Sequence, residues 1–547
     1  MDILTHKSPF LHTPNPVDYL FSQSSGHFSI YLPFHPSDSF VSDIAASDSE
    51  DDVINRPNEQ CVEDSSEWST ASRFTERLLS MCGIGQLHQQ VTIGTLPGDV
   101  LLQIFKLFVD AMYSYYTASE KWCTLVHVCR RWRQLAFTSP CHLNLQLFCK
   151  PPRRPVNKML EVWPELPVYL HAFDYPYKED RDKVAAAFRL NHRVSGIRLE
   201  RTSDSAWETF APLMQHPFPV LTHLWVEPRL SITNPISRSF LGGSAPCLKD
   251  LVLVGVPLPA LPELLLSATH LVRLWYDNIP HSGYIPPQAM VTGLSALTRL
   301  ESLSLTFLSL QDLPERSIRD PPPHTRILLP AFTNLRFLGA SEYMEVLATQ
   351  IDAPSLESLE TTLFYQGVLE VSELGKFVRR ADKLSLVDRA KVTFKPDYIS
   401  VKLSQELLAG RIDPNTLMLK PSLPEWDFRP LNLAKFCASL FPTYPPFECL
   451  EIAVPFMWQD VIDDPDPQWL ELLRLFNTVK HLRLYGPVTS RVFKLLRGLP
   501  VEQFMEVLPA LEIVFIPDLD YLGPVKEDIS VFIDARQLSG HPVSIHY

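Results

Sequence analysis

The chain has 547 residues, a net charge of −13 and 46% hydrophobic residues, a composition that supports a large buried core and two to four domains. Its nine cysteines are an odd number without a CxxC pair, so the sequence favours free thiols in a reducing compartment over a disulfide framework or a zinc site. The chain opens without a cationic and apolar leader and has no apolar run of about eighteen residues, so we expect a cytoplasmic and/or nuclear protein without membrane association.

The negative charge lies mainly at the start of the chain. Residues 1–90 hold 13 acidic and 4 basic side chains, a balance of −9, which leaves −4 for the rest. Residues 1–85 are rich in Ser, Pro, Asp and His, and SFVSDIAASDSEDD at 39–52 has no hydrophobic period, which predicts a short disordered acidic tail. Ser47 and Ser49, flanked by carboxylates, suit an acidophilic kinase, although a solvated tail without a signal explains the same residues. No long basic stripe follows, so no nucleic-acid partner is expected.

Residues 96–149 predict three short helices. Asp99 precedes an apolar set at the spacing of an amphipathic helix, where a carboxylate favours the helix N-terminus. That set consists of Val100, Leu101, Ile104, Phe105 and Phe108. Two further sets follow, namely Trp122, Leu125, Val126 and Cys129, then Trp132, Leu135 and Ala136, with arginines on the polar side. A unit of about fifty residues has a marginal core, so a permanent partner or a neighbouring domain is expected.

The pairing of LPGDVLLQIF at 96–105 with VCRRWRQLAF at 128–137 resembles an F-box, the helical module that docks substrate receptors onto the Skp-type adaptor of cullin-RING ubiquitin ligases. The resemblance implies an F-box over residues 90–149. The adaptor-binding residues that it implies are Leu96, Pro97, Val100, Leu101, Ile104, Phe105, Val128, Cys129, Trp132 and Leu135. Residues 109–120 are longer and more aromatic than in a minimal F-box, which leaves the adaptor contacts of that loop open. The alternative is that these helices form one face of a larger helical core.

A proline-rich connection is expected at 150–170. Its prolines, which preclude a long helix and favour extended geometry, are Pro151, Pro152, Pro155, Pro164 and Pro167. Trp163 is expected to anchor this connection on the following domain, which makes the linker semi-rigid.

From residue 171 to the end, a six-residue unit recurs with apolar residues at its first, fourth and sixth places. The copies are VSGIRL at 194, LTHLWV at 221, LKDLVL at 248, LVRLWY at 271, LESLSL at 300, LRFLGA at 335, LESLET at 356, ADKLSL at 381, PNTLML at 414, FECLEI at 447, VKHLRL at 479 and LEIVFI at 511. A dozen copies at spacings of 21 to 35 residues predict a repeat architecture in which short strands alternate with helical returns.

The expected fold is therefore a disordered tail, a three-helix F-box and an α/β solenoid over 171–547 with a parallel sheet on its concave side. The repeats resemble leucine-rich repeats, but the usual Asn or Cys ladder is missing, so irregular repeats are expected. Residues 241–305 also resemble a repeat region that accompanies F-boxes in many fungal proteins. This resemblance implies an architecture rather than a substrate.

The third and fifth residues of each unit are expected on the concave surface. The fifth residues are Arg198, Trp225, Val252, Trp275, Ser304, Gly339, Glu360, Ser385, Met418, Glu451, Arg483 and Phe515. Trp225 and Trp275 are candidate anchors for a partner, since aromatic side chains dominate interface energies. His223 and Arg273 add polar groups, and these four residues form the candidate substrate face. The alternative is that a loop or a terminal segment covers the tryptophans.

The sequence offers no case for catalysis. It lacks GxSxG, GxxxxGK[ST], HExxH and CxxC motifs, and the carboxylates of VIDDPDP at 461–467 are best explained as a solvated turn. No cofactor and no metal are expected. The chain is interpreted as a non-enzymatic receptor subunit of a ubiquitin ligase, with the adaptor, through it a cullin-RING ligase, and an unknown substrate protein as partners.

A second hypothesis is a scaffold or sensor whose helical module binds its own repeats. The two hypotheses differ at three side chains. The receptor hypothesis predicts that Leu101, Ile104 and Phe105 are exposed in the isolated chain, and the scaffold hypothesis predicts that they are buried.

Overall fold

The structure of the protein, a computed structural model, describes the chain from Ile93 onward with gaps. The described residues are 93–112, 122–139, 142–143, 145–149, 166–173, 178–308, 326–364, 371–384, 388–394, 399–404, 416–422, 430–440, 447–454, 468–500, 503, 506–517 and 525–547. The tail expected over residues 1–85 and most of the proline-rich connection lie outside them.

Two compact units divide at Leu101, a residue inside helix α3 (Gly98–Met112). The first unit contributes η1 (Ile93–Thr95) and the opening turn of α3. The second contains the rest of α3, then α4 (Cys123–Val128) and α5 (Arg130–Thr138), and all strands of the described chain. The three short helices expected in this region are thus present.

Local chemistry explains where two of these helices begin. Pro97, which has no amide hydrogen to lose, lies just before α3, and its carbonyl accepts the first helical hydrogen bond from the Leu101 amide at 3.1 Å. Cys129 has extended backbone angles between α4 and α5. Its Sγ accepts a hydrogen bond from the Trp132 amide at 3.5 Å and so caps α5.

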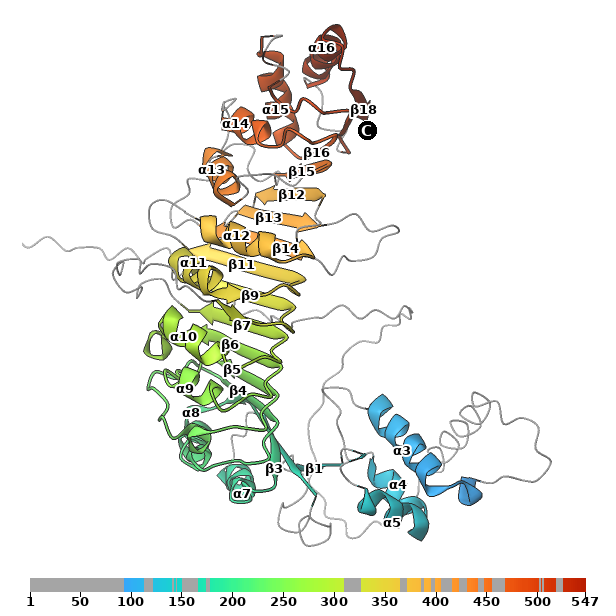
Figure 1. Ribbon diagram of the computed structural model, residues 1–547, viewed down its shortest axis with the longest axis vertical. Helices are drawn as coiled ribbons and strands as arrows, with labels where there is room; N and C mark the ends of the chain where they lie inside the picture. Colours follow the sequence, from blue (N-terminus) through green and yellow to red (C-terminus); the bar gives the residue numbers. More distant parts are fainter. Residues whose placement is uncertain are drawn as a thin grey trace, which may run out of the picture. The chain divides into compact units, whose positions relative to one another are not determined.

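A large, mostly parallel sheet follows the helices, with sixteen strands in the described residues (Figure 1). Their bounds are β1 (Leu147–Cys149), β2 (Val168–Phe173), β3 (Val194–Thr202), β4 (His223–Pro228), β5 (Asp250–Val254), β6 (Arg273–Ile279), β7 (Ser302–Phe307), β9 (Asn334–Ala340), β11 (Ser358–Phe364), β12 (Arg389–Phe394), β13 (Ile399–Ser404), β14 (Thr416–Ser422), β15 (Cys449–Ala453), β16 (His481–Tyr485), β17 (Ile513–Phe515) and β18 (Ser544–His546). A separate two-stranded sheet pairs β8 (Ile327–Leu328) with β10 (Ile351–Asp352).

Strands follow one another in sequence order except in the middle of the large sheet. There the spatial order is β11, β14, β13, β12, β15. β13 is antiparallel to both of its neighbours, so β12, β13 and β14 form a meander that runs backwards along the sheet. This arrangement makes β14 parallel to β11, and β12 parallel to β15.

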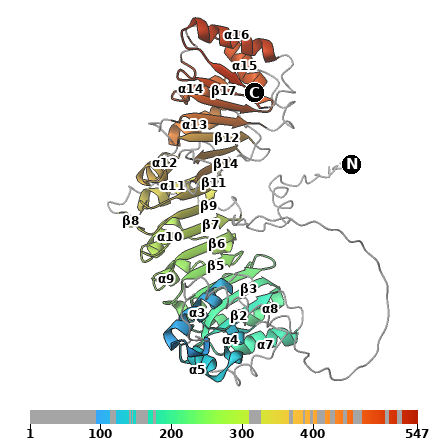
Figure 2. The same ribbon diagram turned by 90° about the vertical axis from the view of Figure 1, so that its right-hand side faces the viewer.

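Helices accompany the strands and lie along one side of the sheet from α9 to α13 (Figures 1 and 2). Their bounds are α7 (Lys178–Phe188), α8 (Asp204–Phe210), η3 (Leu213–Gln215), η4 (Phe240–Gly243), α9 (Leu261–Leu265), η5 (His281–Gly283), α10 (Pro287–Leu294), α11 (Ser341–Gln350), α12 (Ser372–Arg380), α13 (Pro430–Leu440), α14 (Gln468–Arg474), α15 (Val488–Arg497) and α16 (Val525–Leu538). Alternate residues of most strands join one hydrophobic core that runs from Cys149 to Val543. We call the opposite side of the sheet, which carries the third and fifth residues of the units, the outward face.

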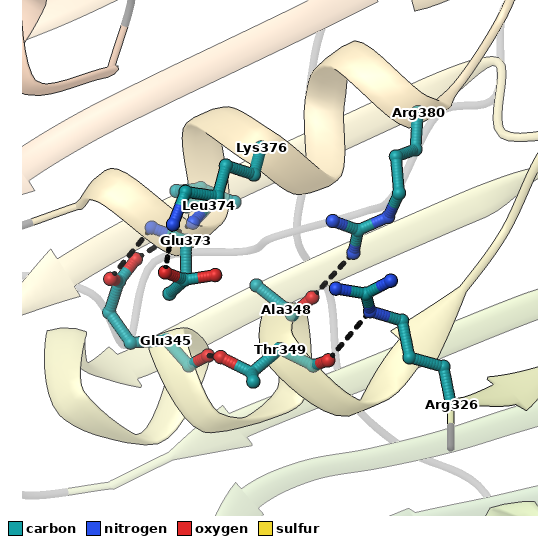
Figure 3. Close-up of polar contacts among 8 residues, drawn as sticks. All are labelled: Arg326, Glu345, Ala348, Thr349, Glu373, Leu374, Lys376 and Arg380. Carbon is teal, nitrogen blue, oxygen red and sulfur yellow. Dashed lines mark hydrogen bonds and ion pairs between the residues drawn. The ribbon is translucent and has the colours of Figure 1, made fainter. Parts of the chain in front are cut away.

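Neighbouring helices are also joined by polar contacts (Figure 3). Both carboxylate oxygens of Glu345 on α11 accept hydrogen bonds from the amides of Glu373 and Leu374, at 3.0 and 2.9 Å, and so cap the N-terminus of α12. At the other end of α12, Arg380 donates to the carbonyls of Ala348 and Ile351, at 2.7 and 3.1 Å. The two helices are therefore fixed at both ends.

A backbone ladder joins consecutive units at the start of their strands. The carbonyl of the second residue in one unit accepts the amides of the second and third residues in the next unit. Thr222, for example, accepts from Lys249 at 2.8 Å and from Asp250 at 3.1 Å. The series of such carbonyls runs through Ser195, Thr222, Lys249, Val272, Glu301 and Thr333, and resumes with Glu448 and Lys480. These bonds use main-chain groups alone and fix the register between consecutive strands.

Most of the predicted units contain a strand, and two predictions need correction. The copy placed at 335 begins at Phe332, because Arg336 pairs in register with Ser304 of β7 and Glu360 of β11. Arg336, not Gly339, is therefore the fifth residue. The copy placed at 381 is wrong, since Ala381–Leu384 form a turn that ends α12, and the strand begins at Arg389.

The sheet starts before the predicted repeat region. β1 lies within the range expected for the F-box, and β2 begins inside the range expected for the linker, where it pairs with β1 from Val168 to Leu170. The strand at 544–546, which closes the sheet, was also not predicted. These segments contain too few alternating apolar residues to be recognised as strands from the sequence alone. Their strand structure depends on pairing with a neighbour.

Candidate protein-interaction faces

Helix α3 carries two apolar stripes, and only one of them is buried. Leu101 and Phe105 are 0% exposed. Val100 and Leu107 are 38% and 58% exposed, and Ile104 between them is half-buried. Since residues at i, i+4 and i+7 share one helix face, these three side chains form a continuous stripe, which we call the exposed stripe. An apolar stripe that no described residue covers indicates a partner.

The buried side of the module packs around aromatic rings. Phe105 lies 4.7 Å from Trp132 between ring centroids, and Trp122 lies 6.3 Å from Phe137 in an edge contact. The Trp122 indole donates a hydrogen bond to the Gln146 carbonyl at 2.9 Å, which satisfies its buried polar atom. These contacts give the helices a core of their own.

The prediction that Leu101, Ile104 and Phe105 are all exposed is wrong for Leu101 and Phe105. The physical reason is that α3 has two apolar stripes, and its sequence does not say which one turns inward. Phe105 and Trp132 nevertheless lie outside the core cluster of the sheet. Their burial therefore does not favour the scaffold hypothesis, in which the module would be buried against its own repeats.

The other implied adaptor residues divide between buried and exposed positions. Leu96 and Trp132 are buried and Leu135 is half-buried, whereas Pro97 and Cys129 are exposed. Val128, at the end of α4, is 52% exposed. Leu107, the most exposed apolar side chain among the described residues of α3, was missed, although its spacing from Ile104 could have indicated it.

Trp225 and Trp275 meet on the outward face of the sheet. They lie on β4 and β6, on either side of Val252 on β5. Both rings lean over that valine, with centroids 6.4 Å apart and an interplanar angle of 62°, and Val252 is buried as a result. Both tryptophans are half-buried, so one side of each ring remains accessible.

Charged groups surround the two rings. The Arg198 guanidinium lies 4.5 Å from the Trp225 ring centroid, and that of Arg273 lies 5.7 Å from the Trp275 ring centroid. Trp225 also donates from Nε1 to Glu227 at 3.1 Å. The candidate substrate face is therefore brought together, and we call Arg198, Trp225, Arg273 and Trp275 with His223 the tryptophan patch.

Ion pairs neutralise the cations of this patch. Arg198 donates from Nε to Glu200 at 2.6 Å, and His171 lies 3.3 Å from the same carboxylate. Burial alone would raise the pKa of Glu200, but the hydrogen bonds from His171 and Arg198 outweigh it and the pKa is lowered.

Asp250 shows the same balance beside the second tryptophan. Its carboxylate lies 3.1 Å from His223 Nε2 and forms an ion pair with Arg273 at 3.3 Å. Burial tends to raise the pKa of Asp250, and these two partners lower it overall. The cations of the patch are thus held in place by partners, which orients them against the rings.

Several fifth residues are less accessible than expected. Arg198, Val252, Ser304 and Glu451 are buried, because side chains from neighbouring strands cover them. Ser385 lies outside the described residues. Tyr169, which was not predicted, belongs to this face because its ring occupies the space over Gly196, where a Cβ would lie 2.2 Å from Tyr169 Cδ2.

The described residues contain no group of three or more side chains that could hold a metal ion. None of their helices has the length and apolar character required to cross a bilayer. The VIDDPDP segment falls outside the described ranges.

Comparison with known families bears on the helical module. Residues 93–141 match the family model of the F-box-like domain. No curated protein matches the chain.

Proposed function

Because residues 93–141 form an F-box-like domain, we propose that the chain is the substrate-recognition subunit of an SCF-type cullin-RING ubiquitin ligase. The observation that carries this proposal is the exposed stripe of Val100, Ile104 and Leu107 on α3. F-box domains typically bind Skp-type adaptors, and an uncovered apolar stripe supplies the surface that such a contact needs.

We further propose that the sheet and its helices form an irregular solenoid similar to leucine-rich repeats. The spatial succession of strands in near-sequence order and the backbone ladder from Ser195 to Thr333 support this proposal. The tryptophan patch is then a surface for the protein to be ubiquitinated, since paired, partly accessible aromatic rings are frequent binding hot spots.

The chain would be non-enzymatic and would act in the cytoplasm and/or nucleus. Its contribution is positional, because holding a target near the ubiquitin-charged enzyme raises the effective concentration of the target's lysines.

The test is co-purification of the full chain with the host Skp-type adaptor, with one exposed residue changed at a time. Leu107→Asp is expected to weaken the complex by about thirtyfold or more, because a central apolar contact contributes about 2 kcal/mol or more. Gln537→Asp, which adds the same charge at an exposed position of α16 outside the helical module, is the matched control and should retain the adaptor.

A second variant distinguishes loss of the adaptor contact from unfolding of the module. Phe105→Ala removes a fully buried ring and is expected to destabilise the module by about 3–5 kcal/mol, so adaptor loss in this variant accompanies unfolding. Leu107→Asp should lose the adaptor with the circular dichroism and thermal midpoint of the wild type. A folded wild-type chain that purifies without affinity for the adaptor would refute the ligase proposal and favour the scaffold.

A further inference from the structure

A second charged surface lies on the outward face of the sheet, away from the tryptophan patch in strand order. Five cations occupy outward positions on β14, β13, β12 and β16, and β15 lies between the last two of these strands. We call them the basic band: Arg389, Lys391, Lys402, Lys420 and Arg483. They are spread over almost a hundred residues of sequence, so the sequence did not predict that they form one basic surface. The fold brings them together through the reversed meander.

Two lysines of the band face each other directly. Lys391 and Lys402 are register partners on the antiparallel strands β12 and β13, so their Cα atoms lie about 5 Å apart. Like charges opposite each other in a sheet are destabilising. The repulsion between these lysines does not stabilise the sheet, so an anionic ligand explains their presence better than a role in folding does.

The carboxylates of the same strands do not balance the band. On the outward positions of β11 to β16, the described residues offer Glu360, which pairs with Lys420 at 2.6 Å, and Glu451, which pairs with Lys391. Lys402 has no ion pair with any described residue. Arg389 has an interaction partner of its own. The other four cations stand against these two carboxylates at the outward positions of the described strands, in a chain whose net charge is −13.

Arg483 adds an independent observation at the far end of the band. Its guanidinium lies 4.8 Å from the Phe515 ring centroid, which holds the side chain over the outward face. Its Nε is buried and has no hydrogen-bond partner among the described residues. A buried donor without an acceptor costs free energy, and a ligand oxygen would remove that cost.

We propose that the basic band binds an extended acidic segment of a partner protein. That partner is the protein to be ubiquitinated, an identification that rests on the proposed ligase function. From β14 to β16 the band spans about 19 Å, because adjacent strands lie about 4.8 Å apart. An extended chain covers that distance with about six residues. The ligand is thus a segment of about six residues rich in Asp and Glu.

A protein segment fits the band better than a nucleic acid. Glu360 and Glu451 interrupt the cations, which disfavours a continuous phosphate backbone but allows carboxylates spaced along a peptide. The tryptophan patch differs in that its arginines are already paired.

Fluorescence anisotropy of the full chain with labelled hexaglutamate and hexaglutamine peptides, each flanked by Gly-Ser, tests the proposal. Hexaglutamate is expected to bind, with an affinity that falls as salt rises, and hexaglutamine is not. Lys391→Ala/Lys402→Ala should weaken binding about fivefold, equivalent to about 1 kcal/mol. Lys494→Ala/Lys526→Ala, which removes two exposed lysines from helices α15 and α16, is the matched control and should bind like the wild type.

Each other outcome overturns the assignment. Equal binding by both double variants would show non-specific attraction. A labelled single-stranded oligonucleotide that binds more tightly than hexaglutamate through the same lysines would make the ligand a nucleic acid. Peptide binding that appears only after Asp48, Glu50, Asp51 and Asp52 are neutralised would identify the chain's own acidic segment as the occupant.

The adaptor co-purification keeps the two proposals separate. A chain that binds the adaptor but not hexaglutamate retains the ligase function and loses the acidic-segment assignment. A chain that binds hexaglutamate through Lys391 and Lys402 but not the adaptor retains the basic band as a binding surface outside a ligase.

Discussion

At the scale of single residues, Asp277 on β6 shows how a strand side chain can be ionisable and yet buried. Ser304 on β7 donates a hydrogen bond to its Oδ1 at 2.6 Å. Burial nevertheless dominates and raises the pKa of Asp277 above its ordinary value of 3.8, while the Ser304 bond and the charge of Arg336 oppose the rise. A carboxyl group with this environment is more easily kept neutral in the folded chain than in the unfolded chain.

Asp277→Asn is therefore expected to increase the free energy of unfolding at neutral pH. In the wild type, Asp277 does not lower the free energy of unfolding below pH 3.8, where it is protonated in both states. As pH rises through the raised folded pKa, the free energy of unfolding falls, and it stays lower above that pKa. The asparagine keeps an acceptor for Ser304 and removes this penalty. Urea unfolding of both proteins over a pH series measures the difference, which should vanish at low pH.

The difference between the two proteins isolates Asp277 from other acids. Glu200 and Asp250 have lowered pKa values, so they contribute the opposite pH dependence in both proteins and cancel. An asparagine variant that is less stable at neutral pH would show that the ionised carboxylate stabilises the fold.

Single residues also show what sequence could and could not reveal. Trp225 and Trp275 were predicted as neighbours because strand spacing and alternation place them on one face. The contrast between Leu101 and Leu107 was not predictable, because both belong to apolar stripes of one helix. The basic band was hidden for another reason, since Lys391 and Lys402 become neighbours only through a hairpin.

At the scale of elements, the paired helices α11 and α12 depend on one glutamate. No side chain of α12 itself caps its N-terminus. Glu345 performs this role from α11, a helix that ends more than twenty residues earlier in the chain. A cap borrowed from a neighbour stabilises both the helix and the packing between the two helices.

Glu345→Ala is expected to lower the free energy of unfolding by about 1 kcal/mol, with a range of about 0.5–2, because two amides lose their acceptor. Hydrogen exchange should accelerate first at the amides of Glu373 and Leu374. Glu345→Gln keeps an oxygen acceptor and should lose less. Unchanged exchange at these two amides in the alanine variant would contradict the proposed cap.

The order of strands and helices was predicted correctly where a helix follows each strand. It was not predicted in the meander of β12, β13 and β14. The helical returns expected between strands are present, for example as α10 and α12. The ADKLSL copy at 381 failed because a leucine-rich pattern also fits a turn whose Leu384 is buried. Within PNTLML, Thr416–Leu419 belong to β14, which pairs with the antiparallel strand β13 that precedes it.

At the scale of the whole molecule, the large sheet has two ends in the described chain, and both are short strands. β1 and β18 contribute three residues each. Short edge strands limit the number of free backbone groups that another chain could pair with. β18 therefore protects β17, with which it pairs from Ile513 to Phe515.

Deletion of residues 543–547 is expected to promote self-association, because it exposes the edge of β17 and the core beside Val543. Size-exclusion chromatography with light scattering should show oligomers whose fraction rises with concentration. Ser544→Ala/His546→Ala keeps the backbone of β18 and should remain like the wild type. A deletion variant with unchanged mass would indicate that the edge is protected by other means.

The reversed meander has a consequence for the chain while it is being synthesised. Every strand of the large sheet from β2 to β11 can pair with a neighbour that has already been made, so this part of the sheet can grow as it leaves the ribosome. After β11 the next partner is β14, whose first residue, Thr416, comes 52 residues after Phe364. During that interval the edge of β11 that faces away from β9 has no partner strand, and this is the stage at which a nascent chain most needs a chaperone.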